Sequence, residues 1–388
     1  MDVKTTLSQL VQDSGGLLRL KPALVTRLFP PPGRRLGLPD DAYDAGERGC
    51  VTERWLASTT EAQNPIHAPG EGLSFIDTAD GAEISLRDAV EEAPDLIMGS
   101  HYANHHSGLG RLPKIFDNGD RTPFHIHQIQ VDADKTGKDS KERSYYFPPD
   151  APMGPHPEMF FGLHPFIVRE RRKDIIARYF DDWENLDRIL TLSRAYISVP
   201  DDAFHLPPGI LHALGSALTI ELREEPDAGA QSEVSAAAHD IPPSDAEEPG
   251  MITFVNQLDW EANGDPYFYE NHHTPPVLMD GSKTASSEEW WIFYNTTKYS
   301  GTKLIVRPGC VCTCVDRGAY SILAWSGEGT FGELPMKGRS LTEDEVMVTC
   351  DRARSGVQVV NTGDQDLILF KFFGPDINDD APMMKKYP

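Results

Sequence analysis

Histidine side chains gather in one part of this 388-residue sequence. Nine of its thirteen histidines fall between His101 and His212, a span of under a third of the chain. Within it, His125 and His127 flank Ile126, and a β-strand places alternate side chains on one face, so the two imidazoles converge. A convergent pair can bind a transition metal, although an isolated pair is more often a polar strand face. Both interpretations stay open on this pattern alone.

Further ligands and the strands that carry them complete the metal hypothesis. We predict a strand over Phe124–Val131 for the histidine pair. Glu158, in HPEMFFG, lies at the start of another apparent strand. His212 follows a Pro-Pro-Gly turn that leads into a further strand. A β-barrel can bring such sites together as three nitrogen ligands and one oxygen ligand.

The composition favours short strands over long helices. Gly 32 and Pro 31 exceed one structure breaker per seven residues, which predicts a mainly β protein. A small helix is expected after a Ser85 N-cap, ending before Pro94. The longest helical pattern is Lys173–Leu192, where apolar residues recur at steps of three and four. We interpret this helix as an insertion in the β structure.

We predict two folded units joined by an acidic linker. Residues 226–250 are rich in Ala, Ser, Pro and acidic residues, and such a segment cannot bury enough apolar surface to order itself. The predicted domains are therefore 1–225 and 251–388. In the second, Cys310, Cys312 and Cys314 share one strand face; a thiolate metal site is conceivable, but buried small side chains are the favoured interpretation.

The charge excludes several partners. Sixty acidic residues against thirty-six basic ones give a net charge of -24, which opposes binding to nucleic acid and to anionic membranes. No stretch approaches the ~18 apolar residues of a membrane span, and the first residues lack an export signal. Five cysteines without a C-x-x-C pair indicate reduced thiols. We predict a cytoplasmic protein; its oligomeric state is not readable.

Five segments resemble the class I phosphomannose isomerase branch of the cupin superfamily, in the same order. They start at Glu53 (ERWLAST), Ile84 (ISLRDAVEEAPDLIMG), Leu112 (LPKIFDNGDRTPFHIH), Pro157 (PEMFFGLHPF) and Asp202 (DAFHLPPGILHALG). The resemblance covers much of the first 225 residues. It implies two cupin (double-stranded β-helix, jelly-roll) domains, the first binding metal and the second lacking the ligand set.

The resemblance also implies a site. His125 aligns with the family's metal-binding Gln. The family's other ligand positions align with His127, Glu158 and His212. One divalent transition metal is implied, with zinc first and manganese, iron or nickel as alternatives. His156, Lys114, Glu221 and Arg223 are the candidates for the base and the charge stabiliser.

The function implied is sugar isomerisation or epimerisation through an enediolate. The family's arginine segment is replaced here by acidic residues, with Arg223 the nearest guanidinium, so we expect an unphosphorylated or modified sugar as the small-molecule substrate. Two alternatives stay open: a cupin dioxygenase that uses the same ligands, and a carbohydrate-binding module without turnover.

Overall fold

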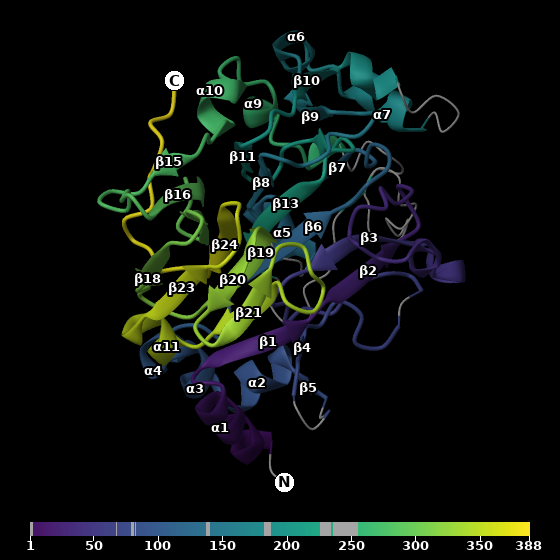
Figure 1. The fold of residues 1–388 in the computed structure, drawn as a ribbon. Helices are drawn as coiled ribbons and strands as arrows, with labels where there is room; N and C mark the ends of the chain where they lie inside the picture. The colour runs from purple at the N-terminus through teal and green to yellow at the C-terminus, as the bar shows by residue number, and fades with distance from the viewer. Residues whose placement is uncertain are drawn as a thin grey trace.

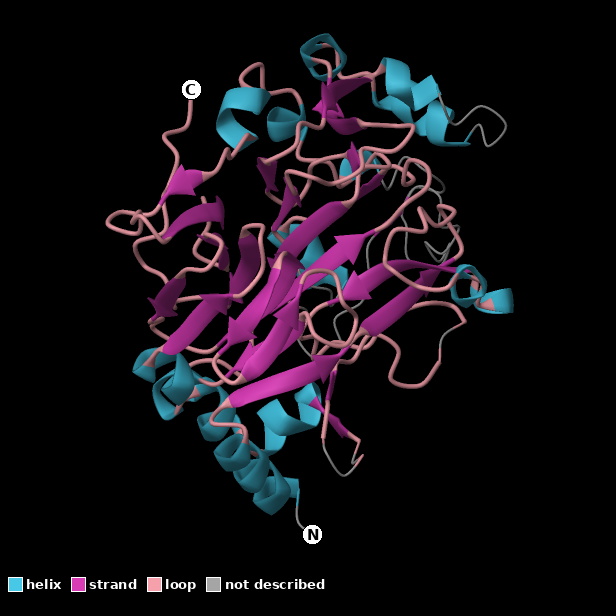
Figure 2. Cartoon of the chain, in the orientation of Figure 1, coloured by secondary structure: helices cyan, strands magenta, loops and turns pink. Residues whose placement is uncertain are grey.

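The computed structural model describes residues 3–66, 68–78, 81, 83–136, 140–181, 188–225, 234–235 and 255–388. The chain is mainly β, as the abundance of glycine and proline predicts, and every strand pair is antiparallel. Strands occupy the middle of the molecule and most helices lie at its ends (Figure 2). No helix in the described ranges is long and apolar enough to cross a membrane.

Two sheets form the first barrel. The six-stranded sheet runs in the order β11 (Asp202–Leu206), β8 (Arg143–Phe147), β13 (Thr219–Glu224), β6 (Arg111–Phe116), β3 (Cys50–Trp55) and β2 (Ala23–Arg27). The five-stranded sheet runs in the order β10 (Ser193–Ile197), β9 (Glu158–Leu163), β12 (His212–Ala213), β7 (His125–Ile126) and β14 (Val234–Ser235).

Two further sheets form the second barrel. The nine-stranded sheet runs in the order β15 (Val277–Leu278), β16 (Ser287–Phe293), β17 (Ser300–Val306), β24 (Leu367–Phe373), β19 (Tyr320–Ser326), β22 (Glu345–Val348), β1 (Leu17–Lys21), β4 (Phe75–Ile76) and β5 (Ile84–Ser85). The four-stranded sheet runs in the order β18 (Val311–Cys314), β23 (Val357–Asn361), β20 (Glu328–Phe331) and β21 (Leu334–Lys337).

The helices are short. Their bounds are α1 (Val3–Asp13), α2 (Leu86–Glu92), α3 (Pro94–Met98), α4 (Ser100–Ala103), α5 (Gln130–Thr136), α6 (Pro165–Arg169), α7 (Lys173–Asp181), α9 (Trp260–Asn263), α10 (Phe268–His272) and α11 (Cys350–Ser355), with 3-10 turns η1 (Asp40–Tyr43) and η2 (Gly46–Arg48). In Figure 1, α1 to α4 and α11 lie at one end, and α6, α7, α9 and α10 at the other.

The six-stranded sheet is apolar on the face that meets the nine-stranded sheet. Ile115, Ile220 and Leu222 of the first pack in one cluster with Phe293 and Phe370 of the second. Its other face looks into the first barrel. Because side chains alternate along each strand, one face of this sheet packs against the nine-stranded sheet and the other face can carry polar groups.

A buried ion cluster also joins the two sheets. Arg54 of β3 binds Asp344 with both Nη atoms, at 2.8 and 2.7 Å, and Glu345 at 2.8 Å. The second oxygen of Glu345 accepts from the backbone N–H of Ala57 at 2.7 Å. Because these three side chains are almost fully buried, each needs the others to compensate for lost hydration.

Several predicted elements are confirmed and others corrected. The helix after Ser85 is present, and the Ser85 hydroxyl accepts from the Asp88 N–H at 3.0 Å. The strand predicted over Phe124–Val131 covers two residues, because α5 begins at Gln130. Of the helix predicted over Lys173–Leu192, the α-helical part described ends at Asp181.

The predicted domain division remains a prediction. Of its linker, residues 226–250, the structure describes only Val234 and Ser235, which pair with β7; the rest lies outside the described residues. The strands β1, β4 and β5 precede residue 86, yet they extend the sheet built mostly from residues after 276. The first 85 residues therefore contribute to both barrels.

Candidate metal centre

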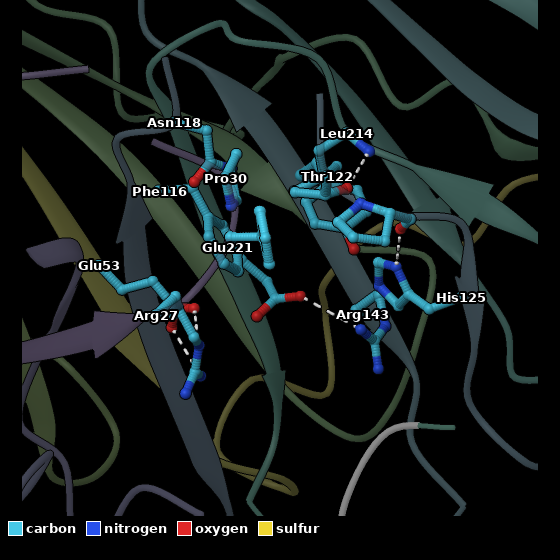
Figure 3. Close-up of a pocket in the computed structure, with 13 residues that line it drawn as sticks. Arg27, Pro30, Glu53, Phe116, Asn118, Thr122, His125, Arg143, Leu214 and Glu221 are labelled. Carbon is cyan, nitrogen blue, oxygen red and sulfur yellow. Dashed lines mark hydrogen bonds and ion pairs between the residues drawn. The ribbon is translucent and has the colours of Figure 1, made fainter. Parts of the chain in front are cut away.

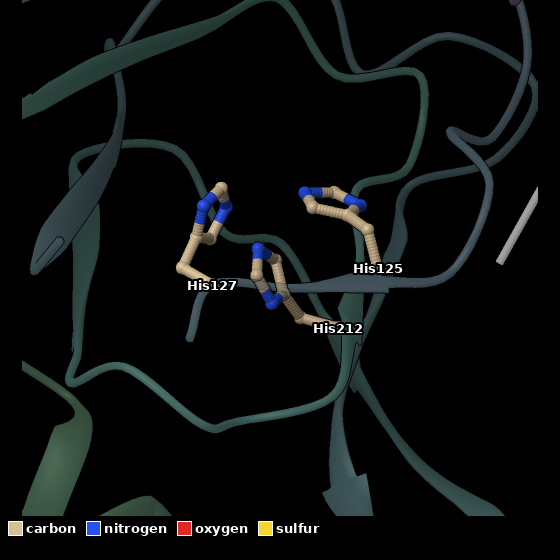
Figure 4. A group of neighbouring side chains, drawn as sticks. All are labelled: His125, His127 and His212. Atoms are coloured by element: carbon tan, nitrogen blue, oxygen red, sulfur yellow. The ribbon is translucent and has the colours of Figure 1, made fainter. Parts of the chain in front are cut away.

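Three imidazoles converge inside the first barrel. His125 lies on β7, His127 directly follows that strand, and His212 lies on the neighbouring β12, opposite His125 in the register. The ring centroids are 4.1 Å apart for His125 and His212 and 5.4 Å for each other pair. One nitrogen from each ring lies within 4.8 Å of the others. Figure 4 shows the rings turned toward one another.

The protein orients two of these rings through their backbone contacts. His125 Nδ1 lies 2.9 Å from the Pro123 carbonyl oxygen, and His212 Nδ1 lies 2.8 Å from the Ile210 carbonyl oxygen. A ring nitrogen facing a carbonyl must donate, so the neutral form of each ring carries its lone pair on Nε2. This is the arrangement that fixes the tautomer of a metal-binding histidine.

His127 completes the group. Its Nε2 is buried and makes no hydrogen bond within the described part of the chain. Burial, together with the charges of Arg143 and the neighbouring histidines, holds the pKa of His127 well below its usual range. The ring is therefore neutral near pH 7, the form that binds metals. The three histidines fit a transition-metal ion.

A cavity of about 150 Å³ is lined by one member of the histidine group, His125. Figure 3 shows His125 at one side of it and Glu221, from β13, reaching in from the six-stranded sheet. The lining residues are Arg27, Phe29, Pro30, Glu53, Phe116, Asn118, Thr122, Pro123, His125, Arg143, Tyr145, Leu214 and Glu221.

Two arginine–glutamate pairs line this cavity. Arg27 Nε lies 2.6 Å from Glu53 Oε1, and Trp55 donates to Glu53 Oε2 at 2.7 Å. Arg143 Nη1 lies 3.5 Å from Glu221 Oε1. Burial alone would raise the pKa of Glu53, but the cations of Arg27 and Lys114 outweigh it and lower that pKa. Glu53 is therefore a carboxylate at neutral pH.

Lys114 and Arg223 lie next to Glu221. Register pairs Glu221 with Lys114 on β6, and Arg223 is two residues along β13 on the same face. Lys114 Nζ is 3.9 Å and Arg223 Nε is 3.8 Å from Glu221 Oε2, and Lys114 Nζ is also 3.6 Å from Glu53 Oε2. All of these side chains are buried. Three of the four predicted catalytic residues are thus brought together.

Glu158 and His156 lie elsewhere, which corrects the predicted arrangement. Glu158 Oε1 is 2.9 Å from Arg121 Nη1 and 3.4 Å from His156 Nδ1, and it is not part of the histidine group. Strand alternation is the reason: Phe161 of β9 opposes His212, so the residue three positions earlier faces the other way. His156 is half-exposed beside Asp120 and does not line the cavity described above.

Sequence reasoning missed Arg27, Arg143 and Tyr145 as cavity residues. A signal was present in RSYYF (residues 143–147), where a charged residue begins a strand rich in aromatic residues. Such a residue needs a partner once it is buried. Which partner it meets depends on the pairing of β8 with β13, which local sequence does not specify.

The paired barrels and the histidine group in the first of them define a cupin-type fold with two barrels. The same fold occurs in solved phosphomannose isomerases. A variant of the enzyme from Salmonella typhimurium superposes with a TM-score of 0.63 at 13% identity, covering 93% of this chain and 100% of that one. The mannose 6-phosphate isomerase from Bacillus subtilis gives 0.62 at 15% identity, covering 92% and 99%.

These likenesses confirm the fold that the resemblance implied. At the level of sequence, the comparison with family models finds no match to this chain, and neither does the comparison with curated proteins.

Proposed function

We propose that this chain is a metal-dependent isomerase or epimerase that acts on an unphosphorylated or modified sugar. The observation that carries the proposal is the convergence of His125, His127 and His212 beside a cavity lined by arginine–glutamate pairs. The fold shared with phosphomannose isomerases is consistent with it. The cavity would hold the sugar between the histidines and the six-stranded sheet.

The three histidines would hold the metal through their ring nitrogens. A divalent transition metal bound there would polarise the carbonyl oxygen of the sugar and so acidify the neighbouring C–H. Neutral imidazoles suit zinc, manganese, iron and nickel alike, and zinc is our first choice. Glu158, paired with Arg121, is not needed for this set.

Glu221 is the carboxylate best suited to carry the proton between adjacent sugar carbons. Both it and Glu53 line the cavity, but Glu53 is engaged by Arg27 at Oε1 and by Trp55 at Oε2. Glu221 Oε2, in contrast, accepts no hydrogen bond within the described residues. It therefore has a lone pair available to accept a proton.

Lys114, Arg143 and Arg223 would stabilise the negative charge of the enediolate. Their cationic groups lie 3.9, 3.5 and 3.8 Å from the oxygens of Glu221. In a buried site such fixed charges act strongly, because little water screens them. His156 lies outside this group and has no part in the proposed step.

The arginine–glutamate pairs favour sugar hydroxyls over phosphate. A pair offers donors and acceptors side by side, which suits hydroxyl groups. A phosphate dianion would have to compete with Glu53 and Glu221 for Arg27 and Arg143. This supports an unphosphorylated or modified sugar as the substrate.

The test is an anaerobic screen of aldoses and ketoses with the metal-loaded protein in D2O. We expect one sugar to interconvert and to gain deuterium at the carbon next to its carbonyl. Glu221→Gln should lower this exchange by roughly 10²-fold or more while metal content stays unchanged. The matched control is Glu333→Gln, which changes an exposed glutamate.

Other outcomes would overturn the proposal. Turnover that requires and consumes oxygen would identify a dioxygenase. Saturable sugar binding with no exchange and no turnover would identify a binding module.

A further inference from the structure

Phe29 marks the mouth of the cavity in the first barrel. It follows β2, and it is the one exposed residue among the described residues that line the cavity, since the others are buried or half-buried. Its exposed fraction, 74%, is the largest of any large hydrophobic residue in the described ranges. Single exposed hydrophobic side chains are ordinary on protein surfaces, but one at the entrance to a cavity is placed to contact whatever enters it.

The segment that carries Phe29 is fixed to the barrel. Three prolines follow Phe29, and each restricts the backbone angle φ. The Gly119 N–H donates to the Pro31 carbonyl at 2.7 Å. Arg35 donates to the Asp117 carboxylate through its backbone N–H and its Nε, each at 2.6 Å. The phenyl ring is therefore exposed on a stiff support, and a ligand that packs on it loses little free energy in ordering the backbone.

The cavity is too small to enclose a ligand much larger than one sugar ring. Its volume is about 150 Å³, whereas pockets that enclose drug-sized ligands measure about 300–1,000 Å³. His125 and Glu221, which the proposed function places next to the reacting carbons, are half-buried and buried. A sugar seated at these two residues fills the cavity, so a group attached to that sugar must leave through the mouth and pass Phe29.

The mouth offers two contacts that suit a sugar ring. The phenyl face of Phe29 can pack against the C–H face of a pyranose, because the negative face of the ring attracts those hydrogens and apolar surface of both partners leaves water. Asn118 lines the cavity beside Pro30, the next residue after Phe29 (Figure 3). An amide side chain carries donors and an acceptor, which suits the hydroxyl groups at the edge of a sugar ring.

We propose that Phe29 binds the second ring of an extended substrate, so that the sugar that reacts is the reducing end of a disaccharide. The inference rests on the proposed function, which places the reacting sugar in the cavity. The second ring stacks on the phenyl face and its hydroxyl groups hydrogen-bond to Asn118. A free hexose has no second ring to make these contacts. Phe29 is thus a specificity-determining residue, which selects disaccharides over free hexoses.

The test compares hexoses with disaccharides that carry the same hexose at their reducing end. Glucose is compared with cellobiose, maltose and lactose, and mannose with mannobiose, on the metal-loaded full chain in the deuterium-exchange assay. We expect kcat/KM to be roughly tenfold or more higher for the preferred disaccharide than for its hexose. Phe29→Ala should lower kcat/KM for the disaccharide by roughly tenfold, mainly through KM, and should change that of the hexose by less than about twofold.

Two further variants control for the loss of the side chain itself. Phe29→Trp keeps an aromatic face and should retain the preference for the disaccharide. Phe166→Ala removes another exposed phenylalanine, which lies on α6 and does not line the cavity, and should leave both activities unchanged. An equal effect of Phe29→Ala on hexose and disaccharide, or a preference of the wild type for the hexose, overturns the inference and leaves the proposed function standing.

Failure of the proposed function has a different signature. If no sugar gains deuterium, calorimetric titration of the metal-loaded protein with the same hexoses and disaccharides decides the inference by itself. Disaccharide binding that is roughly tenfold weaker in Phe29→Ala than in wild type supports the role of Phe29. Equal binding in the two proteins, or no binding of a disaccharide to either, overturns it.

Discussion

His127 is the residue on which the proposed metal site most depends. Its Nε2 is buried and makes no hydrogen bond in the described ranges, whereas His125 and His212 are each oriented by a carbonyl. A buried polar atom without a partner destabilises a fold by about 1–3 kcal/mol unless a ligand satisfies it. The proposed metal would supply that ligand.

Removal of the His127 imidazole should abolish tight metal binding. Purified protein should carry about one transition-metal equivalent per chain, and His127→Ala should lower the affinity by more than about tenfold, because one of three ligands is lost. Elemental analysis with a competing chelator measures both. The control is His105→Ala, an exposed histidine near α4. Wild-type protein that takes up no metal on reconstitution would end the metal hypothesis.

Glu225 makes stability depend on pH. Its carboxylate contacts Thr59, accepts from Thr60 Oγ1 and from the Gly110 N–H, each at 3.1 Å, and burial raises its pKa to about 7. Between its ordinary pKa of 4.5 and about 7, the folded state binds more protons than the unfolded state. The free energy of unfolding should therefore fall as pH rises through this window.

Glu225→Gln should remove this dependence, because the amide stays neutral. Urea denaturation at pH values of about 5 and about 8 should show a smaller loss of stability in the variant than in wild type. Glu333→Gln, at an exposed ion pair, should behave like wild type. The same pH dependence in Glu225→Gln and wild type would contradict the assignment.

At the scale of elements, the acidic segment 226–250 is proposed as the linker between residues 1–225 and 251–388. Its composition cannot support a core. Limited proteolysis should cut there first and yield fragments that end near Pro226 and begin near Met251. Resistance of the segment to cleavage would mean that it packs on one of the barrels. The pairing of Val234 with Ile126 of β7 shows where such packing would begin.

At the scale of the whole molecule, the ion cluster of Arg54 holds the two central sheets together. Arg54→Met should reduce the free energy of unfolding by about 3–5 kcal/mol, because it leaves Asp344 and Glu345 buried without their cation. Arg317→Met, which removes two exposed ion pairs, should cost less than about 1 kcal/mol. Denaturation curves measure both. Equal losses in the two variants would contradict the argument.

The charge of the molecule bears on the substrate. A net charge of -24 opposes the approach of a dianion, and the cavity arginines are paired with glutamates. We therefore expect poor turnover of mannose 6-phosphate. A coupled assay that follows its conversion to fructose 6-phosphate measures this directly. Efficient conversion would mean that Lys114 or Arg223 has been recruited to bind the phosphate.

Local sequence was enough to predict much of the fold and part of the site. Strand alternation predicted that His125 and His127 converge, and the turn before His212 predicted a further strand, which the structure pairs with β7. The Ser85 cap predicted the start of α2. Each of these features depends on residues close together in the chain.

The rest was decided by strand register and by packing between distant segments. Glu158 was expected with the histidines, but the pairing of Phe161 with His212 turns it toward Arg121. Arg143 and Glu221 are 78 residues apart and meet because β8 pairs with β13. A shift of one residue in register would exchange the two faces of a strand, and only burial against the other sheets selects the register. For that reason the sequence predicts which residues can do chemistry, and the tertiary structure decides which of them meet.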